Sequence, residues 1–346
     1  MKNKNKLIFI GPLRMGELPH SGDTMKNRLF LDRFMQEFDK VYTVDTYNWQ
    51  RKPQSLIILM IYLMFIRRAK VVVSCEASAS KIIDFLYYFR LQTKVFYWVV
   101  GSGFVDRIEK GVLPPNHYRF LKAILVQSPK MVQTLQKAGL NNAYFIPNSK
   151  PIYNIQIQKH DTNKTRFVFV SRILPEKGLD YIFNCLKRLN GEGFSGRISI
   201  DFYGIVKEHY LSFLEQVELF PNAKYKGLLN LTSMDGYNTL SSYDVMLFPT
   251  YYDGEGFPGV FIDAFISGLP VIATDWHYNS EVVRDGETGF IIPPKDEDAL
   301  YEKMKWVISN RNIIESYRSN CIEEAKKYDR NAVLSLSNLR SIGLIE

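Results

Sequence analysis

The chain has 346 residues, of which 46% are hydrophobic and 23% charged, and its formal net charge is +8. This length and composition are typical of a soluble globular protein with two α/β domains, and they exclude a low-complexity chain. The three cysteines, Cys75, Cys185 and Cys321, lie far apart and form no CxxC pair. Disulfides and a zinc site are therefore not expected, and a reducing cytosol is the expected compartment.

The first 150 residues alternate between predicted strands and helices. The apolar run of residues 7–10 is too short for a signal peptide and instead forms part of a first strand. A helix is expected over 23–38, because apolar residues recur there at helical spacing. The strands of this half are expected at 7–11, 41–44, 70–74, 94–100, 123–127 and 144–146. The alternation predicts a parallel sheet with helices on both faces.

Charge is unevenly distributed along the chain. Residues 1–150 contain 23 Lys and Arg against 10 Asp and Glu, whereas the remainder contains 21 against 26. A basic half suggests an anionic partner, and anionic membrane or a lipid phosphate is the favoured candidate. The second interpretation is that the excess of basic residues only keeps the protein soluble. Nucleic acid is disfavoured, because no zinc finger, RNP-like aromatic motif or helix-turn-helix is recognisable.

One apolar segment bears on the membrane reading. Residues 56–66 read LIILMIYLMFI and lie between Arg51-Lys52 and Arg67-Arg68. The run is shorter than the ~20 residues that a membrane-spanning helix needs. The favoured interpretation is a helix buried in the core. The alternative is a helix in the membrane interface, with the flanking cations on lipid phosphates.

The second half repeats the pattern of the first. Residues 149–165 are polar and aperiodic, which predicts a linker. Strands are then expected at 166–170, 198–203, 225–227, 244–249, 271–273 and 290–292. We therefore expect an α/β protein with Rossmann-like domains over 1–150 and 151–327, and a C-terminal helix over about 328–346 that packs back on the first. Ligands are expected in a cleft at the carboxyl ends of the two sheets.

The most informative segment runs from Tyr251 to Asp275. It places Glu255 and Asp263 eight positions apart around a Gly-Phe-Pro-Gly turn that opens a short helix. A helix N-terminus offers free N–H groups to an anion, and carboxylates beside it suit sugar or ribose hydroxyls. The segment 171–178, SRILPEKG, also follows a strand and opens a helix. Its Arg172 and Lys177 would complete a diphosphate site.

These motifs together resemble a known family. The sequence carries SRxxxxKG, a strand ending in YG, KGLL, YDVMLFPTYYDGEGFPGVFIDA, GLPVIATD and GETGFIIPP. This series closely resembles the family-4 group of retaining GT-B glycosyltransferases. In the first half, ILVQSPKMVQTLQKAGLNNAYFIPNS is similar to the family's last strand and domain exit. The resemblance covers most of the chain from Ala123 to about Pro294.

The resemblance implies roles for individual residues. Arg172 and Lys177 would bind the donor diphosphate, and Glu255 would face the donor sugar. Asp263 would hold the ribose hydroxyls, at a position where glutamate is usual in the family. Gly22 would approach the donor phosphate, and the glycine at 204 and the segment 227–229 would lie near the base. The implied donor-binding set is Gly22, Gly204, Leu229, Gly256, Phe257, Pro258, Gly259 and Asp263.

The chain departs from the family pattern in its first half. Many relatives carry a histidine after a strand there, near the reacting sugar, whereas this chain has Gly101, Ser102 and Gly103. His20 lies near the glycine loop but is interpreted as an exposed loop residue. Asp296-Glu297-Asp298 spells DxD, which we interpret as the start of a helix and not as a metal motif. No metal or other cofactor is expected.

The function hypothesis follows from these implied roles. A retaining glycosyltransferase would move a sugar from a nucleotide-diphosphate donor to a growing surface glycan, with a lipid-diphosphate-linked acceptor favoured. The expected location is the cytoplasm, peripheral to the inner face of the cell membrane. Two alternatives stay open, a catalytically silent partner subunit that binds nucleotide sugars and a GT-B sugar-nucleotide 2-epimerase. The pairing of SRxxxxKG with the two acids argues against the epimerase.

Overall fold

The computed structural model describes residues 6–14, 22–47, 49, 54–66, 69–76, 79–88, 94–157, 163–207 and 210–346. The chain divides into two compact units. Unit 1 comprises Met1–Ser149 together with Arg330–Glu346, and unit 2 comprises Lys150–Asp329. Each unit contains one six-stranded sheet whose paired strands run parallel, so the α/β architecture predicted from the alternation is confirmed.

The sheet of unit 1 has the strand order β2-β1-β3-β4-β5-β6. Its central strands are almost entirely buried and consist mostly of aliphatic and aromatic residues, because helices cover both faces. The strands are β1 (Lys6–Gly11), β2 (Lys40–Asp45), β3 (Lys70–Val73), β4 (Val95–Trp98), β5 (Ala123–Val126) and β6 (Ala143–Phe145).

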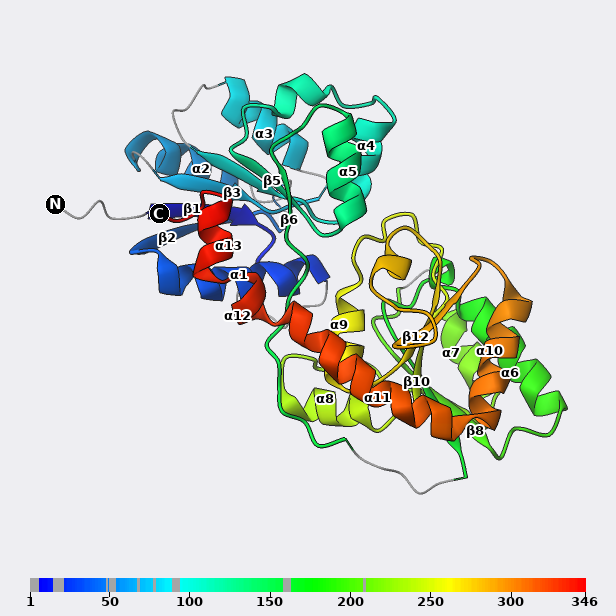
Figure 1. Ribbon diagram of the computed structural model, residues 1–346. Coiled ribbons are helices and arrows are strands. Elements are labelled where there is room, and N and C mark those ends of the chain that lie inside the picture. Colours follow the sequence, from blue (N-terminus) through cyan, green and yellow to red (C-terminus); the bar gives the residue numbers. More distant parts are fainter. Residues whose placement is uncertain are drawn as a thin grey trace. The chain divides into compact units, whose positions relative to one another are not determined.

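Helices lie on both sides of this sheet, as Figure 1 shows for unit 1. One side is covered by α1 (Gly22–Glu37) and by the chain's C-terminal helices α12 (Arg330–Val333) and α13 (Leu336–Ser341). The opposite side carries α2 (Gln54–Phe65), α3 (Ala79–Tyr88), α4 (Gly103–Glu109) and α5 (Pro129–Lys137).

The C-terminal segment shares a core with α1. Phe30 and Phe34 of α1 pack against Trp98 of β4, and Leu334 and Leu339 belong to the same buried cluster. Aromatic side chains of this size bury a large apolar area each, so they dominate the stability of the layer. The last residues of the chain are therefore part of the fold of unit 1.

The interpretation of residues 56–66 as a buried helix is wrong. The segment does form a helix, α2, but most of its apolar side chains are exposed. The sequence suggested burial because an unbroken apolar run is typical of a core helix. In the structure, α2 lies on the outer surface of the sheet and contacts it through one narrow stripe.

Unit 2 repeats the architecture with the strand order β12-β11-β10-β7-β8-β9. Its strands are β7 (Thr165–Val170), β8 (Ile198–Tyr203), β9 (Ala223–Tyr225), β10 (Val245–Phe248), β11 (Val271–Thr274) and β12 (Gly289–Ile292). The strand predicted at 225–227 lies two residues earlier, because Lys226 and Gly227 belong to the loop that follows it. Its helices are α6 (Leu179–Gly191), α7 (Ser212–Glu218), α8 (Met234–Ser241), α9 (Gly259–Ile266), α10 (Glu297–Ser309) and α11 (Arg311–Ala325).

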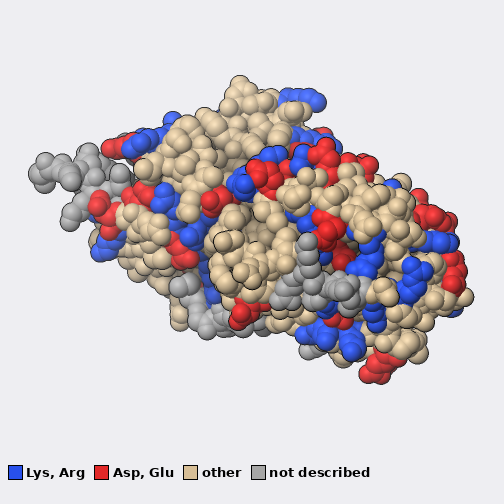
Figure 2. All heavy atoms as spheres, turned by 60° about the horizontal axis from the view of Figure 1, so that its bottom comes forward, with Lys and Arg blue, Asp and Glu red and all other residues tan. Residues whose placement is uncertain are grey.

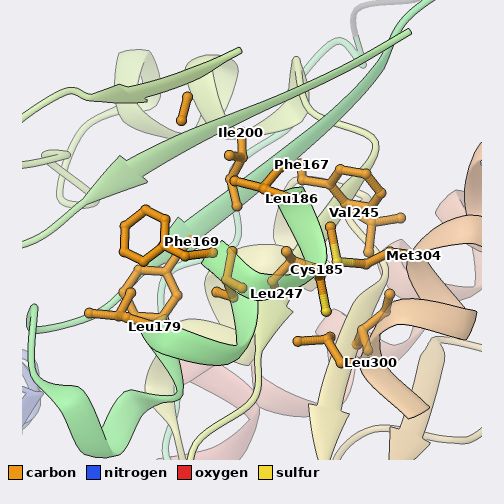
Figure 3. Close-up of a cluster of buried hydrophobic side chains, with 14 of the residues drawn as sticks. Phe167, Phe169, Leu179, Cys185, Leu186, Ile200, Val245, Leu247, Leu300 and Met304 are labelled. Carbon is orange, nitrogen blue, oxygen red and sulfur yellow. The ribbon is translucent and has the colours of Figure 1, made fainter. Parts of the chain in front are cut away.

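Two hydrophobic layers enclose the sheet of unit 2. Figure 3 shows one of them, in which Phe167, Phe169 and Ile200 of the strands meet side chains of α6 and α10. The other layer packs α8, α9 and α11 against the opposite face. On the face drawn in Figure 2, basic and acidic side chains of unit 2 are interspersed. Such mixing is typical of a solvated surface.

Side chains cap the starts of two helices. Ser128 accepts a hydrogen bond from the Met131 backbone N–H, and Pro129 occupies the first position of α5. Asp296 likewise accepts from the Ala299 N–H at the start of α10. The interpretation of Asp296 as part of a helix start is therefore confirmed. Side-chain caps of this kind stabilise a helix by about 1 kcal/mol.

Unit 1 contains a buried lysine near the start of α1. Lys26 is almost inaccessible, and its Nζ donates a hydrogen bond of 2.9 Å to the Val99 carbonyl. Burial disfavours the ammonium form and lowers the pKa of Lys26 to about 7, although the nearby Asp23 opposes the shift. The side chain therefore loses its proton near neutral pH in the folded protein, far below the ordinary value of 10.5.

The lowered pKa of Lys26 predicts how the stability of the protein depends on pH. Between pH 7 and pH 10.5 the unfolded chain binds a proton at Lys26 that the folded chain does not, so the parent should gain stability as pH rises through that window. Lys26→Met removes this contribution. Urea unfolding of both proteins at pH 6.5, 8 and 9.5 should show that the free energy of unfolding of the parent increases with pH relative to that of the variant. A constant difference between them would contradict the inferred titration.

Candidate functional site

The candidate site of unit 2 forms at the point where the order of its strands in the sheet reverses direction. The sheet continues from β7 to β8 and β9 on one side, whereas β10 lies on the other side of β7. Because the strands are parallel, the loops that follow β7 and β10 leave from the same edge of the sheet. Such a switch point is the usual ligand-binding position of an open α/β sheet. Both sequence motifs, 171–178 and 251–259, follow these two strands.

Backbone contacts hold the two loops together. Gly178 has φ +77°, and a Cβ there would lie 2.1 Å from the Pro249 carbonyl oxygen. The Tyr251 N–H also donates to the Glu176 carbonyl at 2.8 Å. A side chain at 178 would separate the loops, so glycine is required for this approach. The loop after β7 and the loop after β10 thus form one structural element.

Lys177 and Glu255 form the central contact of the site. The two side chains make a short ion pair, with only 3% of the Lys177 side chain and 13% of the Glu255 side chain exposed. Burial lowers the pKa of Lys177, and the Glu255 carboxylate opposes that shift. Thr250 Oγ1 lies 3.4 Å from the same Glu255 oxygen. The pair keeps a charged lysine in a largely water-excluded position.

Tyr252 organises the charges around this pair. Its ring lies 5.0 Å from the Arg172 guanidinium carbon and 4.8 Å from Lys177 Nζ. Its backbone carbonyl accepts hydrogen bonds from the Glu255 N–H and from Trp276 Nε1. The structure therefore brings Arg172, Lys177 and Glu255 together around one aromatic ring. No role for Tyr252 was predicted from the sequence, although its position within the motif, three residues before Glu255, could have indicated one.

The turn after Glu255 leads directly into α9. Gly256, Phe257 and Pro258 are buried, and the Phe257 ring packs 5.4 Å from Tyr328. Pro258 is the N-cap residue, and within the described residues no side chain caps the first N–H groups of α9. Gly259, half-buried, is its first residue. The role of this helix start in binding an anion through its backbone N–H groups stays a prediction.

Asp263 lies on α9 and is 2% exposed. Its carboxylate accepts hydrogen bonds from Lys150 Nζ at 2.6 and 2.7 Å and from the Tyr237 hydroxyl at 2.8 Å. Burial raises the pKa of Asp263, and Lys150 and Tyr237 oppose the shift. Neither partner was identified from the sequence, because Lys150 is 113 positions away and lies in the segment interpreted as a linker. The ribose role of Asp263 stays a prediction.

The remaining donor-side residues of unit 2 follow β8 and β9. Gly204 has φ +153°, and its N–H donates to the Gly227 carbonyl at 2.8 Å. A Cβ at 204 would lie 1.7 Å from the Ser171 carbonyl oxygen, so the loops after β7, β8 and β9 are tightly joined. Leu229 is half-buried against the layer that contains α9. These positions share the sheet edge that carries Arg172.

Some candidate residues belong to unit 1 and not to unit 2, which holds the site described above. Gly22 is the first residue of α1, and a Cβ there would meet nothing within 4 Å. Gly101 has φ +70°, and the buried Ser102 donates to an Asp106 carboxylate oxygen at 2.7 Å. His20 lies outside the described residues. The role of Gly22 toward a donor phosphate stays a prediction.

Metal-ligand clusters and membrane-spanning helices are absent from the part of the chain that the structure describes. Among the residues that the structure describes, no three His, Cys, Asp or Glu side chains are grouped as metal ligands. The carboxylates of the DxD sequence have partners: Asp296 caps α10, and Asp298 pairs with Arg188. Over the same described ranges, no helix is both long and apolar enough to cross a membrane.

The buried ion pair of Lys150 and Asp263 is expected to contribute to the free energy of unfolding. Lys150→Met and Asp263→Asn each leave a buried group without its charged partner, so each should lower the free energy of unfolding by about 3 kcal/mol. The double variant should cost clearly less than the two single variants combined. The exposed pair of Lys305 and Glu192 provides the control, because Lys305→Met should have a much smaller effect. Additive losses in denaturant unfolding would show that the pair is not coupled.

Comparison with known proteins places this site in a family. The chain is 25% identical over 242 residues to a phosphatidyl-myo-inositol mannosyltransferase of Mycobacterium leprae, covering 65% of this chain and 60% of that protein. It is 28% identical over 156 residues to the capsular polysaccharide biosynthesis glycosyltransferase CapM of Staphylococcus aureus, covering 44% of this chain and 39% of CapM. The chain thus spans less than two thirds of the length of these relatives.

Structural comparison and a family model complete the assignment. The Anabaena protein HepE, solved with UDP and glucose, has a TM-score of 0.68 at 13% identity, over 97% of this chain and 98% of HepE. This likeness confirms the GT-B fold class expected from the sequence. Residues 153–328, which include every candidate site residue of unit 2, match the model of a glycosyltransferase family. The chain belongs to the glycosyl transferases group 1 family.

Proposed function

We propose that the protein is a retaining glycosyltransferase that moves a sugar from a nucleotide-diphosphate donor to a growing surface glycan. One observation carries the proposal: Arg172, Lys177 and Glu255 meet around Tyr252 at the switch point of unit 2. Two cations and one carboxylate are the groups that a sugar diphosphate requires, since the phosphates need positive charge and the sugar hydroxyls need acceptors. The family match supports the reaction class.

The chemistry depends on charge that develops during transfer. When the bond from the sugar to the β-phosphate breaks, negative charge grows on the leaving diphosphate. Arg172, Lys177 and the N–H groups at the start of α9 would stabilise that charge more than they stabilise the bound ground state. Retention would follow from a front-face displacement in which the leaving phosphate takes the acceptor proton. No protein nucleophile is required by this route.

The ion pair of Lys177 and Glu255 affects how a donor diphosphate can bind. In the free protein Glu255 neutralises Lys177, so a diphosphate has to compete with that carboxylate for the lysine. Binding would transfer Lys177 to the phosphate and release Glu255 toward the sugar. Tyr252 would hold both cations in place during the exchange, because its ring contacts them independently of Glu255. Asp263 would serve the ribose only if the donor can share it with Lys150 and Tyr237.

The acceptor is proposed from the relatives. CapM is described as a capsular polysaccharide glycosyltransferase, and the mycobacterial relative as acting on a phosphatidyl-myo-inositol. We therefore propose a glycan carried on a lipid diphosphate, built at the cytoplasmic face of the cell membrane by a peripheral enzyme. HepE was solved with UDP and glucose, which supports a nucleoside diphosphate donor in this fold.

Two substitutions should change donor binding in different ways. Lys177→Ala removes a charge-assisted contact and should weaken nucleoside diphosphate binding by about tenfold or more. Glu255→Gln removes the competitor for Lys177, so binding should stay equal or become tighter while sugar transfer falls. Isothermal calorimetry and a transfer assay with purified nucleotide sugars would measure both effects.

The control for this pair is Arg188→Ala. Arg188 is a partly exposed cation of unit 2 that pairs with Asp298 on α10. Its loss should leave both binding and transfer unchanged. Weaker diphosphate binding in Glu255→Gln, or unchanged binding in Lys177→Ala, would contradict the proposed exchange. Donor hydrolysis by the parent in the absence of an acceptor would separate an enzyme from a silent binding subunit.

Transfer should also survive chelation. Arg172, Lys177 and the backbone donors of α9 supply the positive charge at the leaving group, so we propose that no divalent metal is required. Activity measured in excess EDTA should match activity without it. Loss of transfer that added Mg²⁺ or Mn²⁺ restores would replace the cation mechanism with a metal-assisted one.

A further inference from the structure

The helix α2 exposes an apolar surface that no part of the described chain covers. All twelve of its residues are described, and the exposed large side chains include Met64 at 61% and Phe65 at 77%. A surface helix normally carries polar residues on its outer side. The exposed large apolar residues of α2 are Leu56, Ile57, Ile58, Met60, Ile61, Met64 and Phe65.

A narrow inner stripe attaches α2 to unit 1. Leu59 is buried, and the Tyr62 ring packs 5.2 Å from that of Tyr42 on the edge strand β2. Ser55 Oγ donates to the Asp45 carbonyl at 2.8 Å, and Ile66 is buried just beyond the helix. These positions recur at helical spacing and lie on one side. The outward side is therefore apolar although the helix is already anchored.

The sequence that flanks this helix carries charge of a single sign. Between Asp45 and Glu76 the sequence contains no acidic residue, whereas Arg51-Lys52 precede the helix and Arg67-Arg68 follow it. On β2, Lys40 Nζ lies 5.2 Å from the Tyr42 ring that packs on α2. An apolar surface within a cationic stretch complements a bilayer whose headgroups are anionic.

We propose that α2 docks the protein on an anionic lipid surface by inserting its outward face among the headgroups and upper acyl chains. A helix of twelve residues is about 18 Å long, and a bilayer core is about 30 Å thick, so α2 lies in the interface and does not span it. Insertion removes the exposed apolar side chains from water. The cationic flanks add electrostatic attraction, which salt screens.

A lipid surface fits this face better than a protein partner does. The outward residues of α2 carry no hydrogen-bonding side chain apart from Gln54 at its first position. Protein interfaces usually combine an apolar centre with hydrogen bonds that fix the register, whereas acyl chains need none. A second copy of this chain would also bring two cationic stretches together. Lipid is therefore the occupant that the observations favour.

Docking through α2 would bring the enzyme to the membrane surface that carries a lipid-linked acceptor, and to this extent it rests on the proposed function. It does not depend on the donor chemistry. Arg172, Lys177 and Glu255 belong to unit 2, whereas α2 belongs to unit 1. Binding to vesicles can therefore be measured without any nucleotide sugar, and failure of one proposal leaves the other standing.

The test replaces three exposed residues of α2 in one protein, Ile57→Gln, Met64→Gln and Phe65→Gln. Its matched control replaces three exposed apolar residues of unit 2, Leu211→Gln, Leu219→Gln and Ile313→Gln. Vesicles of phosphatidylcholine alone and of phosphatidylcholine with phosphatidylglycerol are used in a flotation assay at low and high salt. Thermal unfolding of each variant confirms that it is folded.

The parent and the control variant should float with the anionic vesicles, and much less with neutral ones or at high salt. The α2 variant should bind anionic vesicles about tenfold or more weakly, because three inserted apolar side chains are lost. Equal binding by the α2 variant and the parent would overturn the proposal. So would a parent that ignores vesicles but sediments as a dimer, with the α2 variant sedimenting as a monomer, since that face would then be a protein interface.

Discussion

The buried ion pair of Lys177 and Glu255 is the constraint on which the site of unit 2 depends. The Lys177 side chain is 3% exposed, and this burial lowers its pKa, whereas the adjacent Glu255 carboxylate opposes the shift. Keeping that carboxylate within reach requires the loops after β7 and β10 to touch. Gly178 permits this contact against the Pro249 carbonyl. The position of one charge thus explains why glycine is required at residue 178.

The same arrangement links fold to reaction. A parallel sheet places the ends of β7 and β10 at one edge, and the reversal of strand order leaves that edge free for a ligand. Tyr252 then fixes the cations without neutralising them, since a ring attracts a cation but carries no net charge. In the proposed exchange, a donor diphosphate would replace Glu255 at Lys177 without rearrangement of the loop. The site would then be preorganised for an anion, with Glu255 in that place in the free protein.

The sequence predicted the elements well where patterns are local. Alternating buried strands and helices, the helix start at Asp296, and the loops around Arg172 and Glu255 follow from spacing and side-chain chemistry. The interaction of Asp263 with Lys150 could not be predicted, because no periodicity connects residues 113 positions apart. The exposure of α2 was only the alternative interpretation for a related reason: an apolar run has the same sequence pattern whether it faces a core or an apolar partner.

The central claim is that a nucleoside diphosphate takes Lys177 from Glu255. A crystal structure of the protein with a bound nucleotide sugar tests it most directly. The account predicts diphosphate oxygens about 3 Å from Lys177 Nζ and close to Arg172, with the Glu255 carboxylate turned to a sugar hydroxyl. A diphosphate bound elsewhere on unit 2, with the Lys177–Glu255 ion pair unchanged, would contradict it.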